Sequence, residues 1–375
     1  MSILDKVSES FLLHRGGEAS LYRLESSGKT YCLKCYAKGL NFDESVIQRI
    51  QEAKTSGVFA VKEYGCRAGM SYLVYDFVNG VSLGRFDCLD AIVALYLLRS
   101  VVRTLKELSE YGIHHGDLSP SNVIVDASLN VTVVDFGIVG PGTLAYAAPE
   151  RFHGGRASEK SDIFGLAMLL FRLISGTELI DSDDYESFAN AQSRVESMDV
   201  TSILYERFLA RGVNSDYGIL KALEPLWKGC LAKDPDGRVS DLDELDELLE
   251  IAFDFITPGD VLFEKSRASF ATRVIEEIGT ESATCEKSTE FPLKIGVTKI
   301  SGRNKKLLLP IAFILILLIT VALALFDSDG VSVDETGNAL LRKSRNLEIQ
   351  SVESDSNFFI PEESLDSLPQ PGLNP

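Results

Sequence analysis

One short stretch of this 375-residue chain carries two carboxylates and an amide of a kind that can handle protons and metal ions. Asp117 and Asn122 lie in the run that begins at His115, and Asp135 follows in an Asp-Phe-Gly tripeptide. Transfer of a phosphoryl group from a nucleotide needs a carboxylate that orients the acceptor hydroxyl and two oxygen ligands that hold magnesium against the phosphates. These side chains have the types that this chemistry requires.

Two short apolar segments are expected to position them. Residues 123–126 and 131–134 are rich in β-branched side chains and are separated by a turn-like sequence. The pattern predicts a hairpin, so the chain leaves Asn122 and returns to place Asp135 beside it. We therefore expect Asp117 to converge with both of these residues.

The run from His115 to Asn122 and the Asp-Phe-Gly after it resemble the catalytic loop, H-x-D-L-x-x-x-N, and the magnesium loop of the eukaryotic-type protein kinases. Small-molecule kinases of the aminoglycoside phosphotransferase kind share these strings. Residues 142–150 are also similar to G-T-x-x-Y-x-A-P-E, the segment that closes a protein-kinase activation loop. Small-molecule kinases generally lack this segment, so the resemblance favours a protein kinase.

Two further segments extend the resemblance in the same order along the chain. Residues 161–175 predict a helix that is apolar on all sides and therefore buried. The resemblance makes it the central helix of the large lobe, with Asp162 accepting backbone amides of the catalytic loop. A segment similar to C-L-x-x-D-P-x-x-R ends at Arg238, which would pair with Glu150 of A-P-E. The implied fold for residues 11–252 is α+β and bilobal, protein-kinase-like, with a small antiparallel β lobe and a larger helical lobe.

The resemblance also assigns nucleotide-binding positions in the small lobe. Gly16 and Gly17 stand where a glycine-rich phosphate loop belongs, just before a strand with Leu21, although one glycine alone of G-x-G-x-x-G survives. A plain hairpin turn is the alternative interpretation. Lys34 falls where the lysine that contacts the α and β phosphates of ATP belongs, and Cys32 replaces the small residue over the adenine ring.

The acidic partner of this lysine has two candidates on a helix predicted from about residue 41 to 54, with a start resembling a capping box. Glu52 lies at a plausible distance along the chain. Counting back without gaps from the next strand gives Gln48 instead, which would leave no ion pair. Further along, the backbone of Asp76 and Val78 is expected to bind adenine at the hinge between the lobes.

Two departures from the family pattern bear on mechanism. Gly116 replaces the arginine of H-R-D, with which a phosphorylated activation loop usually pairs. The activation segment, residues 138–147, is unusually short. Its hydroxyl groups are those of Thr143 and Tyr146, and both of these residues belong to the closing motif. We therefore expect an activity that does not depend on loop phosphorylation. Ser119 stands where serine/threonine kinases commonly have a lysine, which leaves the substrate class open.

The remaining chain predicts a membrane anchor. Residues 253–306 are interpreted as a juxtamembrane linker that includes a helix from Asp260 to about Ile278. Residues 307–326 carry no charge, and their length matches a hydrocarbon thickness of roughly 30 Å. A buried core helix is the alternative interpretation. Basic residues at 303–306 orient the kinase domain to the cytoplasm by the positive-inside rule.

The rest of the chain, residues 327–375, carries ten acidic and three basic side chains and is expected to be a mostly disordered extracytoplasmic tail. It offers a segment that a partner outside the cytoplasm would fold on binding. The net charge of −18 argues against nucleic acid as a partner. All six cysteines precede residue 286, on the predicted reducing side, so no disulfide is implied.

The resemblance implies a single-pass membrane protein kinase that uses ATP and Mg²⁺ to phosphorylate serine or threonine in a protein substrate. Lys34 would hold the α and β phosphates, Asn122 and Asp135 the magnesium ions, and Asp117 the acceptor hydroxyl. Two alternatives stay open. A membrane-tethered pseudokinase that serves as a binding module is favoured if Gln48 faces the lysine, and a small-molecule kinase is disfavoured by the A-P-E match.

Overall fold

The structure is a computed structural model, and the chain divides into two units, residues 1–296 and 297–375. The residues that it describes belong to the first unit: 2–136, 142–182, 184–212, 217–257, 259–284 and 293. Within these ranges no helix is both long enough and apolar enough to cross a membrane. The span predicted at 307–326 and the tail after it lie outside the described residues.

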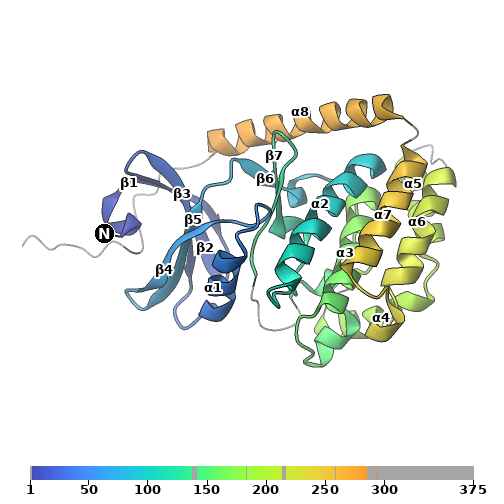
Figure 1. Ribbon diagram of the computed structural model, residues 1–375, viewed down its shortest axis with the longest axis horizontal. Helices are drawn as coiled ribbons and strands as arrows, with labels where there is room; N and C mark the ends of the chain where they lie inside the picture. The colour runs from blue at the N-terminus through green and yellow to red at the C-terminus, as the bar shows by residue number, and fades with distance from the viewer. Residues whose placement is uncertain are drawn as a thin grey trace, which may run out of the picture. The chain divides into compact units, whose positions relative to one another are not determined.

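The N-terminal lobe is built on a five-stranded antiparallel sheet (Figure 1). In spatial order its strands are β1 (Val7–Arg15), β2 (Ala19–Ser26), β3 (Lys29–Tyr36), β5 (Met70–Asp76) and β4 (Val61–Arg67). Side chains alternate between the faces of a strand. Leu33 and Cys35 therefore pack on one face, in a cluster with Leu293, while Cys32 joins the main core on the other. Lys34 shares its face with Cys32.

Helix α1 (Glu44–Ala53) contributes Ile47 and Ile50 to that main core. The carboxylate of Asp43 caps the helix by accepting a hydrogen bond from the amide of Ser45 at 2.9 Å. The helix therefore begins at residue 44, and the start predicted near residue 41 was three residues early. It ends at Ala53, and the φ of +52° at the following residue, Lys54, turns the chain out of the helix.

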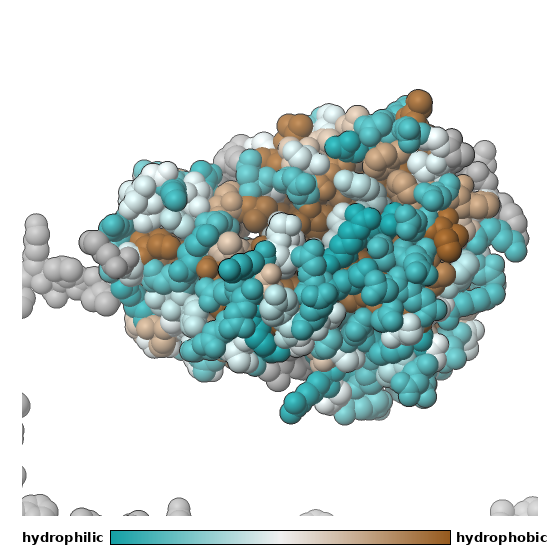
Figure 2. Space-filling view, viewed as in Figure 1, coloured by the Kyte–Doolittle hydropathy of each residue, from teal (hydrophilic) through white to brown (hydrophobic). Residues whose placement is uncertain are grey.

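The C-terminal lobe is helical. Its helices are α2 (Ala91–Ser109), α3 (Glu159–Ser175), α4 (Tyr185–Gln192), α5 (Val200–Ala210), α6 (Tyr217–Cys230) and α7 (Leu242–Ile256). Helix α3 contacts α2, α5, α6 and α7, and the full burial of Phe164 and Phe171 confirms the predicted central helix. The outer face of α2 is charged and joins α7 through pairs such as Arg99 with Asp246, at 3.0 Å. Figure 2 shows this side of the lobe as largely hydrophilic.

The predicted hairpin is confirmed. Strands β7 (Val123–Asp126) and β8 (Val131–Val133) pair antiparallel, and β6 (Gly80–Ser82) completes a small sheet. The Asp126 carboxylate closes the turn by accepting the amides of Ser128 and Asn130, at 2.8 and 2.9 Å. Short 3-10 turns complete the elements: η1 (Ile3–Lys6), η2 (Leu83–Arg85), η3 (Pro120–Asn122), η4 (Leu144–Tyr146), η5 (Pro149–His153), η6 (Val195–Ser197) and η7 (Pro235–Gly237).

The hairpin also connects the two lobes. The amide of Val133 donates to the carbonyl of Gly57 at 2.8 Å, and Val58 forms a parallel bridge with Val133. A Cβ at position 57 would overlap the side chain of Thr104 on α2. Glycine therefore allows the chain between α1 and β4 to approach both α2 and β8 closely.

Helix α8 (Asp260–Thr284) packs against β6 and α2, where Figure 1 shows it as the long orange helix. It extends six residues beyond the predicted end near Ile278. Phe270 and Val274 are buried, at 3% and 0% exposure, and the Phe270 ring lies 4.9 Å from that of Phe86. The guanidinium of Arg273 lies 5.2 Å from the centre of the Phe86 ring. Helix α8 is therefore part of the folded unit.

Replacing Phe270 by alanine is expected to lower the free energy of unfolding by about 3 kcal/mol, because it leaves a cavity beside Phe86. Ile275 is a matched control on the same helix, since its side chain is 57% exposed and its replacement by alanine should cost less than about 0.5 kcal/mol. Urea unfolding of both variants measures the difference. Equal losses would show that α8 contributes nothing through its buried face.

Candidate active site

The backbone of the catalytic loop is held by one buried carboxylate. Asp162, at the start of α3, is 3% exposed. Its Oδ2 accepts a hydrogen bond from the His115 amide at 2.7 Å, and its Oδ1 accepts one from the Gly116 amide at 2.8 Å. Burial raises the pKa of Asp162, and the hydrogen bonds from the two amides oppose that rise. The contact expected from the resemblance is confirmed.

The imidazole of His115 is bound on both sides. Its Nδ1 accepts the Asp117 amide at 3.1 Å, and its Nε2 lies 2.9 Å from the Val134 carbonyl. An Nδ1 that accepts and an Nε2 that donates define the neutral tautomer with its proton on Nε2. The ring also packs 4.5 Å from that of Phe136. His115 therefore organises the loop and the segment of Asp135.

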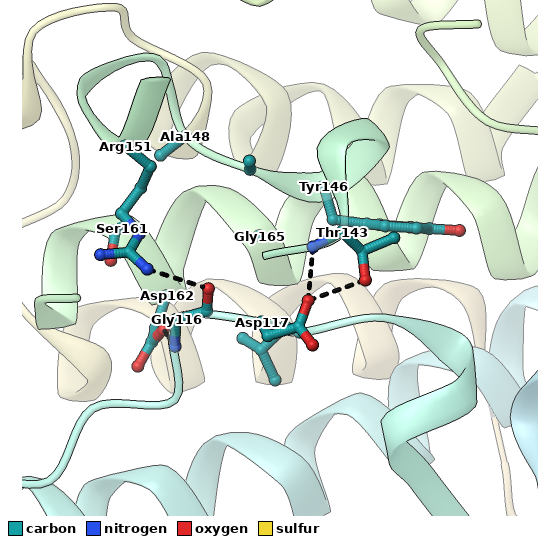
Figure 3. Close-up of a pocket in the computed structure, with 11 residues that line it drawn as sticks. Gly116, Asp117, Thr143, Tyr146, Ala148, Arg151, Ser161, Asp162 and Gly165 are labelled. Atoms are coloured by element: carbon teal, nitrogen blue, oxygen red, sulfur yellow. Dashed lines mark hydrogen bonds between the residues drawn. The ribbon is translucent and has the colours of Figure 1, made fainter. Parts of the chain in front are cut away.

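The carboxylate of Asp117 has defined partners on each oxygen. Its Oδ2 accepts from Asn122 Nδ2 at 3.0 Å, and the same Nδ2 donates to the Asp117 carbonyl at 2.8 Å. Its Oδ1 accepts from the amide of Thr143 at 2.5 Å and from the Thr143 hydroxyl at 2.7 Å, as Figure 3 shows. These bonds fix the direction of the carboxylate.

Asp135 and Lys34 form an ion pair between the two lobes, with Nζ 2.7 Å from Oδ1. Burial alone would lower the pKa of Lys34, but the charge of Asp135, with smaller contributions that include Asp117, raises it overall. Asp135 has a φ of +68°, a conformation rarely adopted by residues other than glycine. Its backbone is thus held in a strained form at the point where its side chain meets the lysine.

The structure brings Lys34, Asp117, Asn122 and Asp135 into one group. The Val134 amide donates to the Asn122 carbonyl at 3.0 Å, which places the residue before Asp135 directly beside the catalytic loop. The charge of Asp117 acts on Lys34 as well. The convergence expected from the hairpin is therefore present.

The two candidate partners on α1 lie elsewhere. Glu52 is exposed near the end of the helix. Gln48 is also exposed, and its Nε2 lies 3.4 Å from the hydroxyl of Tyr64. Among the described residues, the carboxylate recorded within ion-pair distance of Lys34 is that of Asp135.

The sheet face that carries Lys34 also carries the other predicted nucleotide contacts. Leu21 on β2 is the cross-strand neighbour of Lys34, and Cys32 is that of Tyr75 on β5. Burial raises the pKa of the Cys32 thiol to about 12, although a hydrogen bond with Tyr75 opposes the rise. Cys32 is thus a neutral, inert wall of this face. Cys35 points to the opposite face.

The predicted phosphate loop and hinge occupy connecting segments. Gly16 and Gly17 lie in the exposed turn between β1 and β2, where the Gly16 amide donates to the Ala19 carbonyl at 2.9 Å. Asp76 is the last residue of β5, and its amide donates to Ala60. Val78 follows in the connection to β6, and its carbonyl accepts the amide of Gly80 at 3.0 Å.

Glu150 and Arg238 pair as the resemblance implied. Arg238 Nη1 and Nη2 lie 2.8 and 2.7 Å from the two carboxylate oxygens of Glu150. Arg238 is 4% exposed, also donates to the Lys160 carbonyl at 2.7 Å, and lies 5.0 Å over the Phe164 ring. The bidentate pair fastens the A-P-E segment to the core of the helical lobe.

Two residues of the site make contacts that the sequence did not predict. Thr143 was recognised as part of a motif, but its bonds to Asp117 were not foreseen. Arg151 carried no motif, yet it lines a small pocket with Gly116, Asp117 and Thr143 (Figure 3). Gly137, the last residue of Asp-Phe-Gly, lies outside the described residues.

Known proteins resemble this chain in its folded part. The family described as Protein kinase domain matches residues 13–253. The probable serine/threonine-protein kinase PknB of Lactococcus lactis is 25% identical over 260 residues, which cover 62% of this chain and 39% of that protein. Serine/threonine-protein kinase PrkC of Bacillus subtilis is 24% identical over 382 residues, which cover 92% of this chain and 57% of that protein. The crystal structure of the Mycobacterium tuberculosis PknI kinase domain covers 67% of this chain and 99% of that domain, with 18% identity and a TM-score of 0.48.

A small antiparallel lobe, a helical lobe and an aspartate-lysine pair between them define a protein of the kinase class. The chain belongs to the protein kinase family, and both of the relatives named above are bacterial proteins named as serine/threonine kinases. It spans 39% of the length of the Lactococcus protein and 57% of that of the Bacillus protein.

Replacing Arg238 by methionine is expected to lower the free energy of unfolding by roughly 3 kcal/mol, because the half-buried carboxylate of Glu150 and the Lys160 carbonyl would lose their buried cationic partner. Arg267→Met is the matched control, since the pair of Arg267 with Glu264 is exposed and should contribute less than about 0.5 kcal/mol. Denaturant unfolding compares the two variants. A loss for Arg238→Met no larger than that for the control would contradict the role given to the buried pair.

Proposed function

We propose that this chain is an ATP- and magnesium-dependent protein kinase that transfers the γ-phosphate to serine or threonine hydroxyls of a protein substrate. The observation that carries the proposal is the group formed by Lys34, Asp135, Asn122 and Asp117, with its ion pair across the lobes. Phosphoryl transfer depends mainly on positioning and on stabilisation of charge, and this group has the side chains for both.

The oxygen donors suit magnesium, which prefers hard oxygen ligands. Both hydrogen bonds of the Asn122 amide group use Nδ2, so its Oδ1 is oriented away from Asp117 as the remaining acceptor. Asp135 uses Oδ1 for Lys34, which leaves Oδ2 for a cation. We assign Asn122 and Asp135 as the ligands. Bound magnesium supplies positive charge to the phosphates of ATP.

The remaining residues have separate tasks in the proposal. Lys34 directs its ammonium at the α and β phosphates, on a sheet face lined by Leu21 and Cys32. The backbone of Asp76 and Val78 binds adenine, and the turn with Gly16 and Gly17 covers the phosphates. Asp117 accepts a hydrogen bond from the acceptor hydroxyl and orients it for attack, since its carboxylate is fixed by Asn122 and Thr143.

Replacing Asp117 by alanine is expected to lower the turnover of phosphate transfer about a thousandfold, because the group that orients the acceptor is lost. The dissociation constant for ATP with magnesium should change less than about threefold, since Asp117 acts on the acceptor. Labelled ATP with a generic protein acceptor measures transfer, and calorimetry measures binding.

Asp181, which is exposed, provides the control for Asp117. Asp181→Ala should keep the turnover and the melting temperature of the wild-type protein. An unchanged turnover in Asp117→Ala would remove the catalytic assignment.

One observation favours a second candidate, a pseudokinase that acts as a binding module. Glu52 is exposed on α1, and the carboxylate paired with Lys34 comes from the other lobe. A kinase of the usual form also needs an ion pair between this lysine and a glutamate of α1. Magnesium-dependent ATP binding without any autophosphorylation or transfer would select the pseudokinase.

We further propose that residues 307–326 anchor the chain in a membrane, with the kinase domain in the cytoplasm and residues 327–375 on the other side. The support is the uncharged length of the segment and the basic residues at 303–306. The cytoplasm contains ATP and keeps cysteine thiols reduced, which agrees with a kinase domain on that side of the membrane.

The full chain is expected to stay in the membrane fraction after an alkaline carbonate wash, whereas a chain that stops at residue 302 should be released. Leu317→Arg tests insertion directly, since a charge at the centre of a span costs about 3 kcal/mol. It should reduce the membrane-bound share, while Leu317→Ile should not. A full chain found in the supernatant would refute the anchor.

A further inference from the structure

Gly116, the residue before Asp117, adopts a conformation that excludes a side chain of its own. Its φ is +72°, and a Cβ there would lie 2.7 Å from the Cβ of Ala157 and 3.2 Å from Nη2 of Arg151. The space beside position 116 is therefore filled by a guanidinium that another segment supplies. Glycine also has the most flexible backbone of any residue. Without hydrogen bonds that restrain Gly116, the loop would therefore be flexible just before Asp117.

Arg151 lies in η5, directly after the A-P-E motif, and is 5% exposed. Its Nη1 donates to the Gly155 carbonyl at 2.7 Å, and its Nη2 lies 3.5 Å from the Gly116 carbonyl (Figure 3). Burial lowers the pKa of Arg151, and the charges of Asp162, Glu150 and Asp117 act against that change. An arginine keeps its charge even when it is buried, so this is a permanent cation in the catalytic core.

The restraints on Gly116 come from two sides. Its amide donates to the carboxylate of Asp162, and its carbonyl faces the guanidinium of Arg151. Both peptide groups that flank residue 116 are thereby fixed. The second of these groups leads directly into Asp117, so the contact with Arg151 acts on the direction of the catalytic carboxylate.

The closing part of the activation segment contacts the same place. Thr143 donates twice to Asp117, and a Cβ at Gly142 would lie 2.6 Å from the Gly116 carbonyl. Residues 142–155 thus hold the catalytic loop through their own side chains and backbone.

We propose that Arg151 is a positioning residue for phosphoryl transfer. Its buried guanidinium holds the Gly116 carbonyl and so orients Asp117 while the activation segment is unphosphorylated. The inference rests on the proposed kinase function and adds how the site is aligned. Gly116 replaces the arginine of H-R-D, and Arg151, directly after A-P-E, provides a cation beside that position instead. Misalignment by about 1 Å can lower a turnover about a hundredfold, so a single hydrogen-bonded restraint is enough to matter.

The test uses Arg151→Ala in the full chain in detergent, with Arg156→Ala as the matched control because Arg156 is exposed five residues further on. We expect the turnover of Arg151→Ala to fall at least about tenfold, with the KM for ATP within about threefold, because the restraint acts on Asp117 and not on the nucleotide. Arg156→Ala should keep the wild-type turnover.

Rescue separates alignment by charge from simple filling of space. Guanidinium at about 20 mM, far below denaturing concentrations, should restore part of the turnover of Arg151→Ala, whereas urea of the same shape should not. Equal effects of the two compounds, or a turnover of Arg151→Ala equal to that of Arg156→Ala, would overturn the proposal.

If Arg151→Ala does not fold, Arg151→Lys and Arg151→Gln decide, since both keep a long side chain in the same space. A lysine variant within about threefold of the wild type, with a glutamine variant at least about tenfold lower, supports the role of charge. Equal turnover in the two variants contradicts it.

The second measurement concerns phosphate. Wild-type protein treated with a phosphatase, and shown by mass spectrometry to be unmodified at 138–147, should keep its initial rate of transfer. Loss of that rate on removal of a phosphate from this segment would refute alignment by Arg151. A wild-type protein that shows no transfer under any condition would instead refute the proposed kinase function, so the two failures are distinguishable.

Discussion

The carboxylate of Asp162 is the contact on which the geometry of the site depends. It lies at the start of α3, a helix enclosed by α2, α5, α6 and α7, and it cannot reach water without disrupting the core. A buried carboxylate is costly unless its oxygens are hydrogen-bonded. The amides of His115 and Gly116 meet that need. The same two bonds fasten the backbone of the catalytic loop to the central helix, just before Asp117 and Asn122.

The second interaction that positions the site is the ion pair of Lys34 with Asp135 between the lobes. Lys34 and Asp135 compensate each other's charge, so the largely buried ammonium of Lys34 is not left without a partner. A nucleotide with its magnesium ion would bring a phosphate for the lysine and a cation for the carboxylate. The ion pair is thus a preformed substitute for the ligand charges, and it keeps β3 and the segment after β8 at the distance that the proposed chemistry needs.

Sequence predicted those parts of the structure that have a local pattern or a motif. The hairpin of β7 and β8 followed from its β-branched residues, and α3 from an apolar surface on every side. The start of α1 was misplaced because Asn41 and Asp43 are both good N-cap residues, and tertiary contacts decide between them. The same contacts set the rotation of that helix, so the choice between Gln48 and Glu52 was beyond the sequence. Arg151 was missed because its partners are backbone carbonyls, which leave no trace in side-chain composition.

The packing of α8 separates the boundary of the motif pattern from the boundary of the cooperative unit. A fragment cut where the kinase motifs end would lose Phe270 and Val274 and uncover the ring of Phe86. Such a fragment would expose an apolar surface beside β6, close to the connection between the lobes, and this surface would promote aggregation. Recombinant versions intended for crystallography or inhibitor screening therefore need helix α8, because its buried side chains Phe270 and Val274 belong to the core of the folded unit.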